Sequence, residues 1–356
     1  MDNRIVSVQY LRAVAALLVV VAHAGAHPLA EGFFLYDRLG QFGVTLFFVI
    51  SGFIMVAITG KARVAPLDFL RRRIVRVVPL YWLFTGLAAL LAVLAPSLFK
   101  STVFTWPHFL QSLAFIPHVA PGRGGTSPLL SLGWTLNYEA FFYVGFALLA
   151  VLLAWQRVAV LAGAFVALVI IGLVAAPADP VLAFYTDVAL LPFASGAVIG
   201  MLWLEGRFAG WPRSRLAGLA ILALLAGLVT FVLDRSSASL PSFLALLVLC
   251  SALVAGGLAL ERHLPRLGWL ELLGDASYAI YLVHMFVVGA LVALAGRVAD
   301  PSFWPVGLAI IATALVAATL AGVLVHKFVE QPLLRLLRGR RPAKAKEGLA
   351  PTRLTA

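Results

Sequence analysis

The chain has 356 residues, of which 62% are hydrophobic and 12% are charged, whereas soluble domains contain about 45–50% apolar and about 25% charged residues. A globular interior of this size cannot bury so much apolar surface, so the composition excludes a soluble protein. The formal net charge is +12, but the basic residues lie in short segments between apolar runs, which argues against nucleic-acid binding. The single cysteine, Cys250, excludes an internal disulfide and a cysteine-based metal site.

Apolar runs of about 20 residues predict membrane-spanning helices, and continuous rather than alternating hydrophobicity excludes a transmembrane barrel. Ten spans are expected, at 5–26, 40–60, 77–96, 129–153, 158–176, 184–204, 216–233, 242–260, 275–296 and 305–325. The longest expected external loop is 97–128, and its stretch 106–115 is predicted to be a helix at the membrane interface. The expected fold class is an all-α polytopic membrane protein. Its transmembrane domain is expected at 1–330, followed by a largely disordered basic cytoplasmic tail at 331–356.

Lysine and arginine residues are distributed unevenly between the two sides of the membrane. If the N-terminus is cytoplasmic, 22 of the 27 lie on the cytoplasmic side and 5 on the other side. Cytoplasmic loops of membrane proteins carry an excess of these residues. Both termini are therefore predicted to be cytoplasmic, in a multi-pass protein of the cell inner membrane.

Ionisable side chains within a span are costly, so they face the bundle interior or a wet cavity and are functional candidates. Arg12 and His23 share the first expected span and lie eleven residues apart. Eleven residues make about three helical turns, so both side chains lie on one face, about 16 Å apart along the axis. Arg12 is then near the cytoplasmic edge and His23 in the outer half, with His27 at the interface. A membrane anchor and a satisfied core histidine are the structural alternatives.

Polar residues also interrupt the fourth and ninth expected spans. Glu139 lies about ten residues into the fourth, where a carboxylate must be protonated or paired, with Arg or His side chains as candidate partners. A structural ion pair or hydrogen bond is the alternative role. In the ninth, Ser277, Tyr281 and His284 fall on one face at spacings of four and three residues, which favours packing or substrate positioning over catalysis.

Four arginines, Arg71, Arg72, Arg73 and Arg76, precede the third expected span. Such a cluster is typical of lipid-headgroup anchors. It equally suits a phosphate-rich ligand, because guanidinium forks pair with phosphate oxygens. The sequence has no Gly-rich nucleotide loop, no His-Glu-x-x-His metal motif and no Gly-x-Ser-x-Gly elbow.

Six blocks in chain order resemble the acyltransferase 3 family of integral-membrane acyltransferases. They are Arg12 to His23, Phe47-Phe48-Val49-Ile50-Ser51-Gly52-Phe53, Arg72-Arg73-Ile74-Val75-Arg76 with Pro79 and Tyr81, Trp134-Thr135-Leu136 with Glu139, Phe142 and Tyr143, Ser277 to His284, and Glu330-Gln331-Pro332. The resemblance covers nearly the whole chain. Ala13 stands where the family usually has glycine and Thr135 where it usually has serine, and neither change removes a titratable group.

The resemblance implies transfer of an acyl group, usually acetyl from acetyl-CoA, to a hydroxyl of a glycan or related acceptor, as in polysaccharide O-acetylation. Acyl-CoA is then a co-substrate, and no permanently bound cofactor or metal is expected. The candidate residues for the phosphates of coenzyme A are Arg12, Arg72, Arg73 and Arg76. His23 is the candidate general base, because its pKa lies near operating pH, with Glu139 as its candidate catalytic partner. Candidate substrate-positioning residues are Trp134, Tyr143, Ser277, Tyr281 and His284.

Two further functions stay open at this point. A transporter or lipid-carrier flippase would also need many spans and a central polar constellation. The same acyl-transfer machinery would also serve a small molecule or a lipid as acceptor. The expected partners are acyl-CoA, a glycan or lipid-linked acceptor and membrane lipids, with no nucleic acid.

Overall fold

A computed structural model describes residues 5–26, 34–96, 102–122, 125–233, 239–297, 300 and 303–338, which fold into helices joined by turns and loops. The α-helices are α1 (Val6–Ala26), α2 (Phe34–Thr59), α3 (Pro66–Leu94), α4 (Trp106–Leu113), α5 (Trp134–Leu148), α6 (Ala154–Ala175), α7 (Pro180–Tyr185), α8 (Leu191–Leu204), α9 (Arg213–Leu228), α10 (Leu240–Leu260), α11 (Gly268–Ala295), α12 (Trp304–Val325) and α13 (Gln331–Arg338). His27 lies outside the described residues. Within these ranges, nine helical segments are long and apolar enough to cross a membrane. The all-α polytopic fold class is thereby confirmed.

The fourth expected span, 129–153, does not form one long helix. Helix α5 has only 15 residues, about 22 Å of helix, which is less than the roughly 30 Å of a bilayer core. Pro128 and a 3₁₀ turn at Ser131–Gly133 precede it, because proline cannot continue a regular helix. Helices α2, α3 and α6 pack against α5, and irregular backbone at membrane depth is tolerated where protein buries it.

The third span begins earlier than expected, at Pro66 rather than at residue 77. Proline is favoured at the first helical position, where its missing N–H costs no hydrogen bond. The arginine cluster, expected to precede the span, therefore lies on the first turns of α3. Helical geometry then decides which arginines face the bundle.

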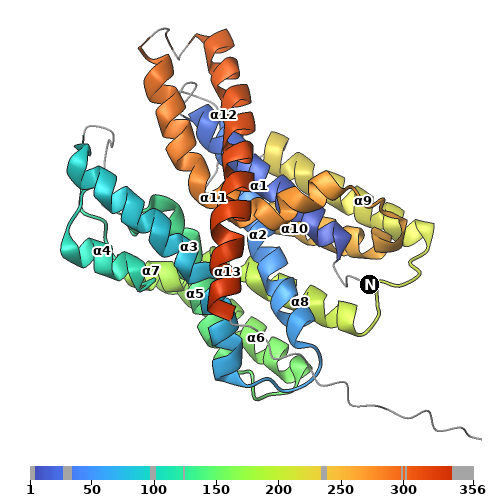
Figure 1. The fold of residues 1–356 in the computed structure, drawn as a ribbon. Helices are drawn as coiled ribbons and strands as arrows, with labels where there is room; N and C mark the ends of the chain where they lie inside the picture. Colours follow the sequence, from blue (N-terminus) through green and yellow to red (C-terminus); the bar gives the residue numbers. More distant parts are fainter. Residues whose placement is uncertain are drawn as a thin grey trace, which may run out of the picture.

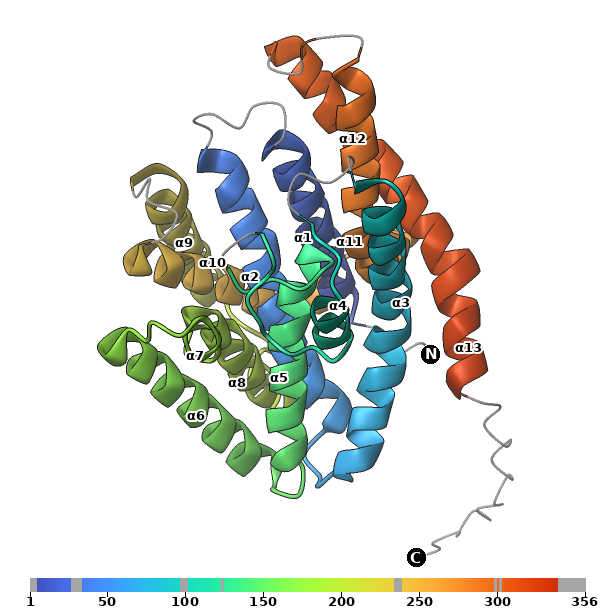
Figure 2. The same cartoon turned by 90° about the vertical axis from the view of Figure 1, so that its left-hand side faces the viewer.

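Helices α1 and α2 form the centre of the bundle, with α11 and α12 on one side and α8 and α10 on the other (Figures 1 and 2). The contact between α2 and α8 depends on small residues. A Cβ added at Gly196 would lie 1.9 Å from the Val49 carbonyl oxygen, and one at Gly52 would lie 2.2 Å from that of Phe193. Glycine permits such backbone contact between membrane helices. This packing holds α2 close to α8.

Helix α12 continues through a π-helical turn at His326–Glu330 into α13, which gives one long helical rod (Figure 2). The boundary expected after residue 330 thus falls inside a helical segment, because residues 331–338 extend it. The remainder of the expected tail, 339–356, lies outside the described residues. Single-turn π segments occur frequently at functional sites.

The segment between α3 and α5 contains a pair of buried histidines. The stretch 106–115, predicted to be helical, contains α4, which is capped by the Thr105 hydroxyl; this hydroxyl accepts from the His108 amide at 3.3 Å. His108 Nδ1 lies 2.6 Å from His118 Nε2, and His118 Nδ1 donates to the Ile116 carbonyl at 2.7 Å. Since His118 Nδ1 carries a proton, its neutral Nε2 accepts from His108 Nδ1. Burial, and secondarily a charge on His118, lowers the pKa of His108 to about 4.

We expect acidification to destabilise this segment between pH 6.5 and about 4. In that range histidine is protonated in the unfolded chain, where its pKa is about 6.5, whereas folded His108 stays neutral. The unfolded state therefore binds more protons, and the free energy of unfolding falls as pH falls. After solvent screening, the loss amounts to about 1–2 kcal/mol. Thermal unfolding of purified protein at pH 7 and pH 4.5 measures it. His108→Gln should show a smaller pH dependence, and an equal dependence in both proteins would contradict the assignment.

Candidate active site

A cavity of about 410 Å³ lies between α1, α2, α3, α5 and α11. Its polar lining residues are Gln9, Arg12, Ser51, Arg73, Arg76, Thr135, Glu139, Tyr143, Ser277, Tyr278 and Tyr281. Three arginines and one carboxylate give this lining a formal excess of positive charge. The Arg73 Nε and Ser277 Oγ atoms are buried and have no hydrogen-bond partner in the described part of the chain. Buried polar atoms are normally paired, so these two atoms are exceptions in the lining of the cavity.

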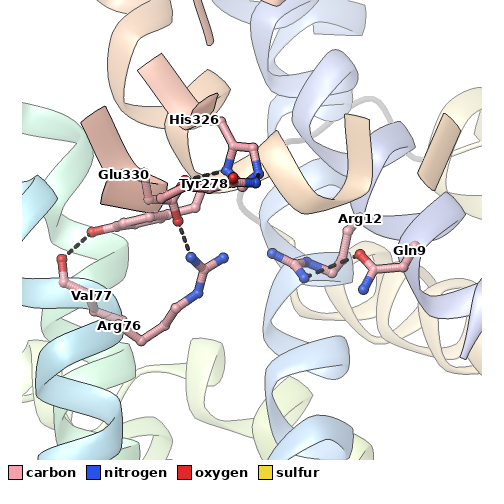
Figure 3. Close-up of polar contacts among 8 residues, drawn as sticks. Gln9, Arg12, Arg76, Val77, Tyr278, His326 and Glu330 are labelled. Carbon is pink, nitrogen blue, oxygen red and sulfur yellow. Dashed lines mark hydrogen bonds and ion pairs between the residues drawn. The ribbon is translucent and has the colours of Figure 1, made fainter. Parts of the chain in front are cut away.

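Arg12 and Arg76 reach the cavity from opposite sides (Figure 3). Gln9 lies one turn before Arg12 on α1, and its side-chain oxygen accepts from Arg12 NH1 at 3.3 Å. Helix α11 approaches α1 closely here, because a Cβ at Gly274 would lie 2.3 Å from the Gln9 carbonyl oxygen. The two guanidinium groups therefore face one space between α1 and α3.

Only two of the three candidate arginines of α3 line the cavity. Arg73 and Arg76 are three residues apart and share one face of the helix, and both are lining residues. Arg72 is exposed and is not among the lining residues. Because successive residues are rotated by about 100° around a helix, Arg72 projects away from the cavity. Its assignment to donor binding remains a prediction that the geometry does not favour.

A hydrogen-bond chain holds Arg76 from the side of α12 and α13 (Figure 3). Arg76 NH1 donates to Glu330 Oε1 in an ion pair, and His326 Nδ1 donates to Glu330 Oε2 at 2.7 Å. The Gln331 side-chain nitrogen lies 3.0 Å from His326 Nε2. Glu330 is 1% exposed. The sequence supplied a signal here, the Glu330-Gln331-Pro332 block, but no role was predicted for it.

Glu330→Ala is expected to lower the free energy of unfolding by about 3 kcal/mol. Removing one partner of a buried ion pair leaves an uncompensated charge, in this case Arg76, and it also removes the acceptor of His326. Thermal unfolding in detergent measures the change. Lys327→Ala is the matched control, because Lys327 is exposed in the same π-helical turn. Equal melting temperatures of the two variants would contradict a stabilising role.

Glu139 is hydrogen-bonded inside the cavity. It accepts from the Ser51 hydroxyl at 3.0 Å and from the Tyr143 hydroxyl one helical turn further along α5. Arg12 and Arg73 line the same cavity. An Arg or His partner was expected for the carboxylate, and the hydrogen bonds observed in the described part of the chain come from Ser51 and Tyr143. The catalytic assignment of Glu139 therefore remains a prediction.

His23 pairs with another histidine, beyond the end of the cavity. His23 Nδ1 lies 3.0 Å from the Val19 carbonyl oxygen and 3.3 Å from His284 Nε2, and the ring centroids are 5.0 Å apart. His284 Nδ1 lies 2.6 Å from the Tyr281 carbonyl oxygen. Neither histidine is a lining residue. The sequence identified both residues but not their contact.

Tyr281 lies between the cavity and the histidine pair. Its ring is 5.9 Å from that of His284 and 6.1 Å from that of Phe47, which also lines the cavity. The Tyr281 hydroxyl contacts Thr135 Oγ1 at 2.8 Å and donates to the Leu132 carbonyl at 2.9 Å. This side chain therefore forms the end of the cavity nearest the histidines.

The other predicted positioning residues divide into lining and packing residues. Tyr143 and Ser277 line the cavity. Trp134 does not: it lies at the start of α5 and packs edge-on against Phe48 and Tyr138. The structure adds Tyr278, whose hydroxyl donates to the Val77 carbonyl at 2.7 Å. Its ring lies 6.0 Å from the Arg76 guanidinium carbon.

Comparison with known proteins gives a consistent result. Residues 5–325 match the family described as "Acyltransferase domain". The exopolysaccharide production protein ExoZ of Rhizobium meliloti (strain 1021) is 38% identical over 321 residues, covering 88% of this chain and 95% of that protein. Acyltransferase MdmB of Streptomyces mycarofaciens is 27% identical over 380 residues, with 95% and 94% covered. Nodulation protein 10 of Rhizobium leguminosarum bv. viciae is 28% identical over 363 residues, with 92% of each chain covered. No solved structure matches the chain.

Proposed function

Since the chain belongs to the acyltransferase 3 family of integral-membrane acyltransferases, we propose that it transfers an acetyl group from acetyl-CoA to a hydroxyl of an exported or cell-surface glycan. ExoZ, similar over most of its length, is named for exopolysaccharide production, which favours a polysaccharide over a small molecule or a lipid as acceptor. The proposed location is the cell inner membrane with both termini cytoplasmic. The excess of 22 of 27 basic residues on one side supports that orientation.

One observation carries the proposal: α1 connects two polar sites that suit the two ends of an acyl-CoA molecule. Arg12 lines a cavity with Arg73 and Arg76, and guanidinium forks bind phosphate oxygens in pairs. His23 follows about 16 Å along the same helix, beside His284. In the proposed orientation the arginines lie on the cytoplasmic side, where coenzyme A is present. The pantetheine arm would then extend past Tyr281 toward His23.

In the proposed reaction His23 acts as a general base. Its Nε2 takes the proton of the acceptor hydroxyl while the hydroxyl oxygen bonds to the acyl carbonyl carbon. The carbon–sulfur bond of the thioester then breaks, and His23 returns the proton to the leaving thiolate. The products are the glycan ester and the free thiol of coenzyme A. The same histidine serves as base and then as acid, as in other acyl transfers.

Release of free thiol from acetyl-CoA by the purified protein in lipid vesicles tests the function. We expect release that depends on added glycan acceptor, together with acetyl ester on the glycan by mass spectrometry. Parallel assays with longer acyl-CoA donors determine the acyl chain. Thiol release with a small-molecule or lipid acceptor but not with glycan would move the assignment to that acceptor. Absence of thiol release with every acceptor would overturn acyl-CoA as donor.

A further inference from the structure

The contacts of His284 determine which of its ring nitrogens carries the proton. Its Nδ1 lies 2.6 Å from the carbonyl oxygen of Tyr281. A carbonyl oxygen only accepts hydrogen bonds, so Nδ1 is the protonated nitrogen. In the neutral ring, Nε2 then carries the lone pair. His284 therefore presents an acceptor to its neighbour on α1.

The contacts of His23 are complementary. Its Nδ1 lies 3.0 Å from the carbonyl oxygen of Val19 and 3.3 Å from His284 Nε2. Both neighbours are acceptors, so Nδ1 of His23 carries the proton and donates to both. The lone pair of neutral His23 is consequently on Nε2, the nitrogen that the proposed reaction uses. The tautomer follows from the two neighbours together.

We propose that His284 is a positioning residue for catalysis: its neutral Nε2 accepts from His23 Nδ1–H and thereby holds His23 in the tautomer whose Nε2 is basic. This inference rests on the proposed function and makes His284 the partner of His23, a role for which Glu139 was the candidate from the sequence. In serine hydrolases a carboxylate fixes the histidine tautomer through the same Nδ1–H. Here an uncharged imidazole and a backbone carbonyl share that role.

The contact also strengthens when His23 takes up a proton. An imidazolium Nδ1–H is a stronger donor than a neutral one, and it still faces two acceptors. The transition state, in which charge develops on His23, is therefore stabilised more than the ground state. A loss of His284 should accordingly lower kcat and leave the KM for acyl-CoA nearly unchanged.

The surroundings of His284 keep its acceptor in place. The residue is fully buried, with 0% of its surface exposed. Tyr281, which accepts from its Nδ1, is itself anchored through its hydroxyl to Leu132 and Thr135. Rotating the His284 ring would break a buried hydrogen bond, which is costly. The acceptor is thus oriented before substrate binds.

Two substitutions at residue 284 separate an acceptor from a space-filling side chain. His284→Leu fills the site without an acceptor, whereas the amide oxygen of His284→Gln reaches approximately the position of Nε2. We expect His284→Leu to lower kcat at least about a hundredfold and His284→Gln to stay within about tenfold of the native protein. The KM for acetyl-CoA should change less than about threefold in both. His263→Leu, an exposed histidine beyond α10, is the control and should match the native protein.

Three results would overturn the inference. They are native turnover in His284→Leu, equal losses in His284→Leu and His284→Gln, and a large rise in the KM for acetyl-CoA in His284→Leu. Melting temperatures of each variant identify a loss caused by misfolding. His23→Asn distinguishes the inference from the proposed function: native turnover in His23→Asn removes the proposed base itself. An inactive His23→Asn beside a fully active His284→Leu removes only the role of His284.

Discussion

His23→Asn is expected to lower the rate of acyl transfer by about 10²–10⁴-fold, the usual contribution of a positioned general base. Asparagine keeps a donor near the position of Nδ1, so the contacts to Val19 and His284 are retained. It removes the basic Nε2. Binding of acetyl-CoA should be nearly normal, because the arginines that line the cavity are unchanged. Single-turnover transfer and titration of donor binding on the purified variant measure the two effects.

The same variant distinguishes direct transfer from an acyl-histidine intermediate. Native protein incubated with radiolabelled acetyl-CoA and no acceptor should carry no covalent label if transfer is direct, which we favour as the simpler chemistry. Label on the native protein that is missing from His23→Asn would establish the intermediate. His27→Ala is the control four residues along the sequence, and its effect should be far milder. Equal losses in both variants would contradict the assignment of His23.

Local sequence patterns predicted those features of the site that depend on one helix. The eleven-residue spacing of Arg12 and His23 was sufficient to place them on one face, because α1 is a continuous helix over both. The arginine cluster required knowing where α3 begins. With the start at Pro66, helical periodicity places Arg73 and Arg76 together and turns Arg72 away. Because the third span was expected to begin only at residue 77, helical periodicity was not applied to these arginines.

Contacts between helices were not predictable in the same way. Ser51 and Glu139 are 88 residues apart, and His23 and His284 are 261 apart. Each pair depends on the relative rotation of two helices, which packing of small residues such as Gly274 against α1 determines. The sequence therefore identified Glu139 and His284 as unusual, but it did not predict the contact between His284 and His23. Predicting the role of Glu330 would have required knowledge of the π-helical turn at His326–Glu330, which has no clear sequence signature.

Arg12→Lys is expected to weaken binding of acetyl-CoA about tenfold or more while turnover persists at high donor concentration. A lysine ammonium is a point charge and cannot reproduce the paired hydrogen bonds of a guanidinium fork with phosphate. Each charge-assisted hydrogen bond contributes about 1.5–3 kcal/mol, and about 1.4 kcal/mol corresponds to a tenfold change in affinity. Equilibrium titration of the purified variant with acetyl-CoA measures the loss.

Two comparisons make that measurement specific for phosphate. Arg72→Lys is the matched control, because Arg72 is exposed on α3 and does not line the cavity, so its donor affinity should equal that of the native protein. The second comparison uses acetyl-pantetheine, a donor without phosphates, whose weaker binding should be the same in native protein and Arg12→Lys. If Arg12→Lys binds acetyl-CoA as tightly as the native protein while His23→Asn loses binding, the arginine cavity is not the donor site. The separation of phosphate binding from chemistry along α1 would then fail.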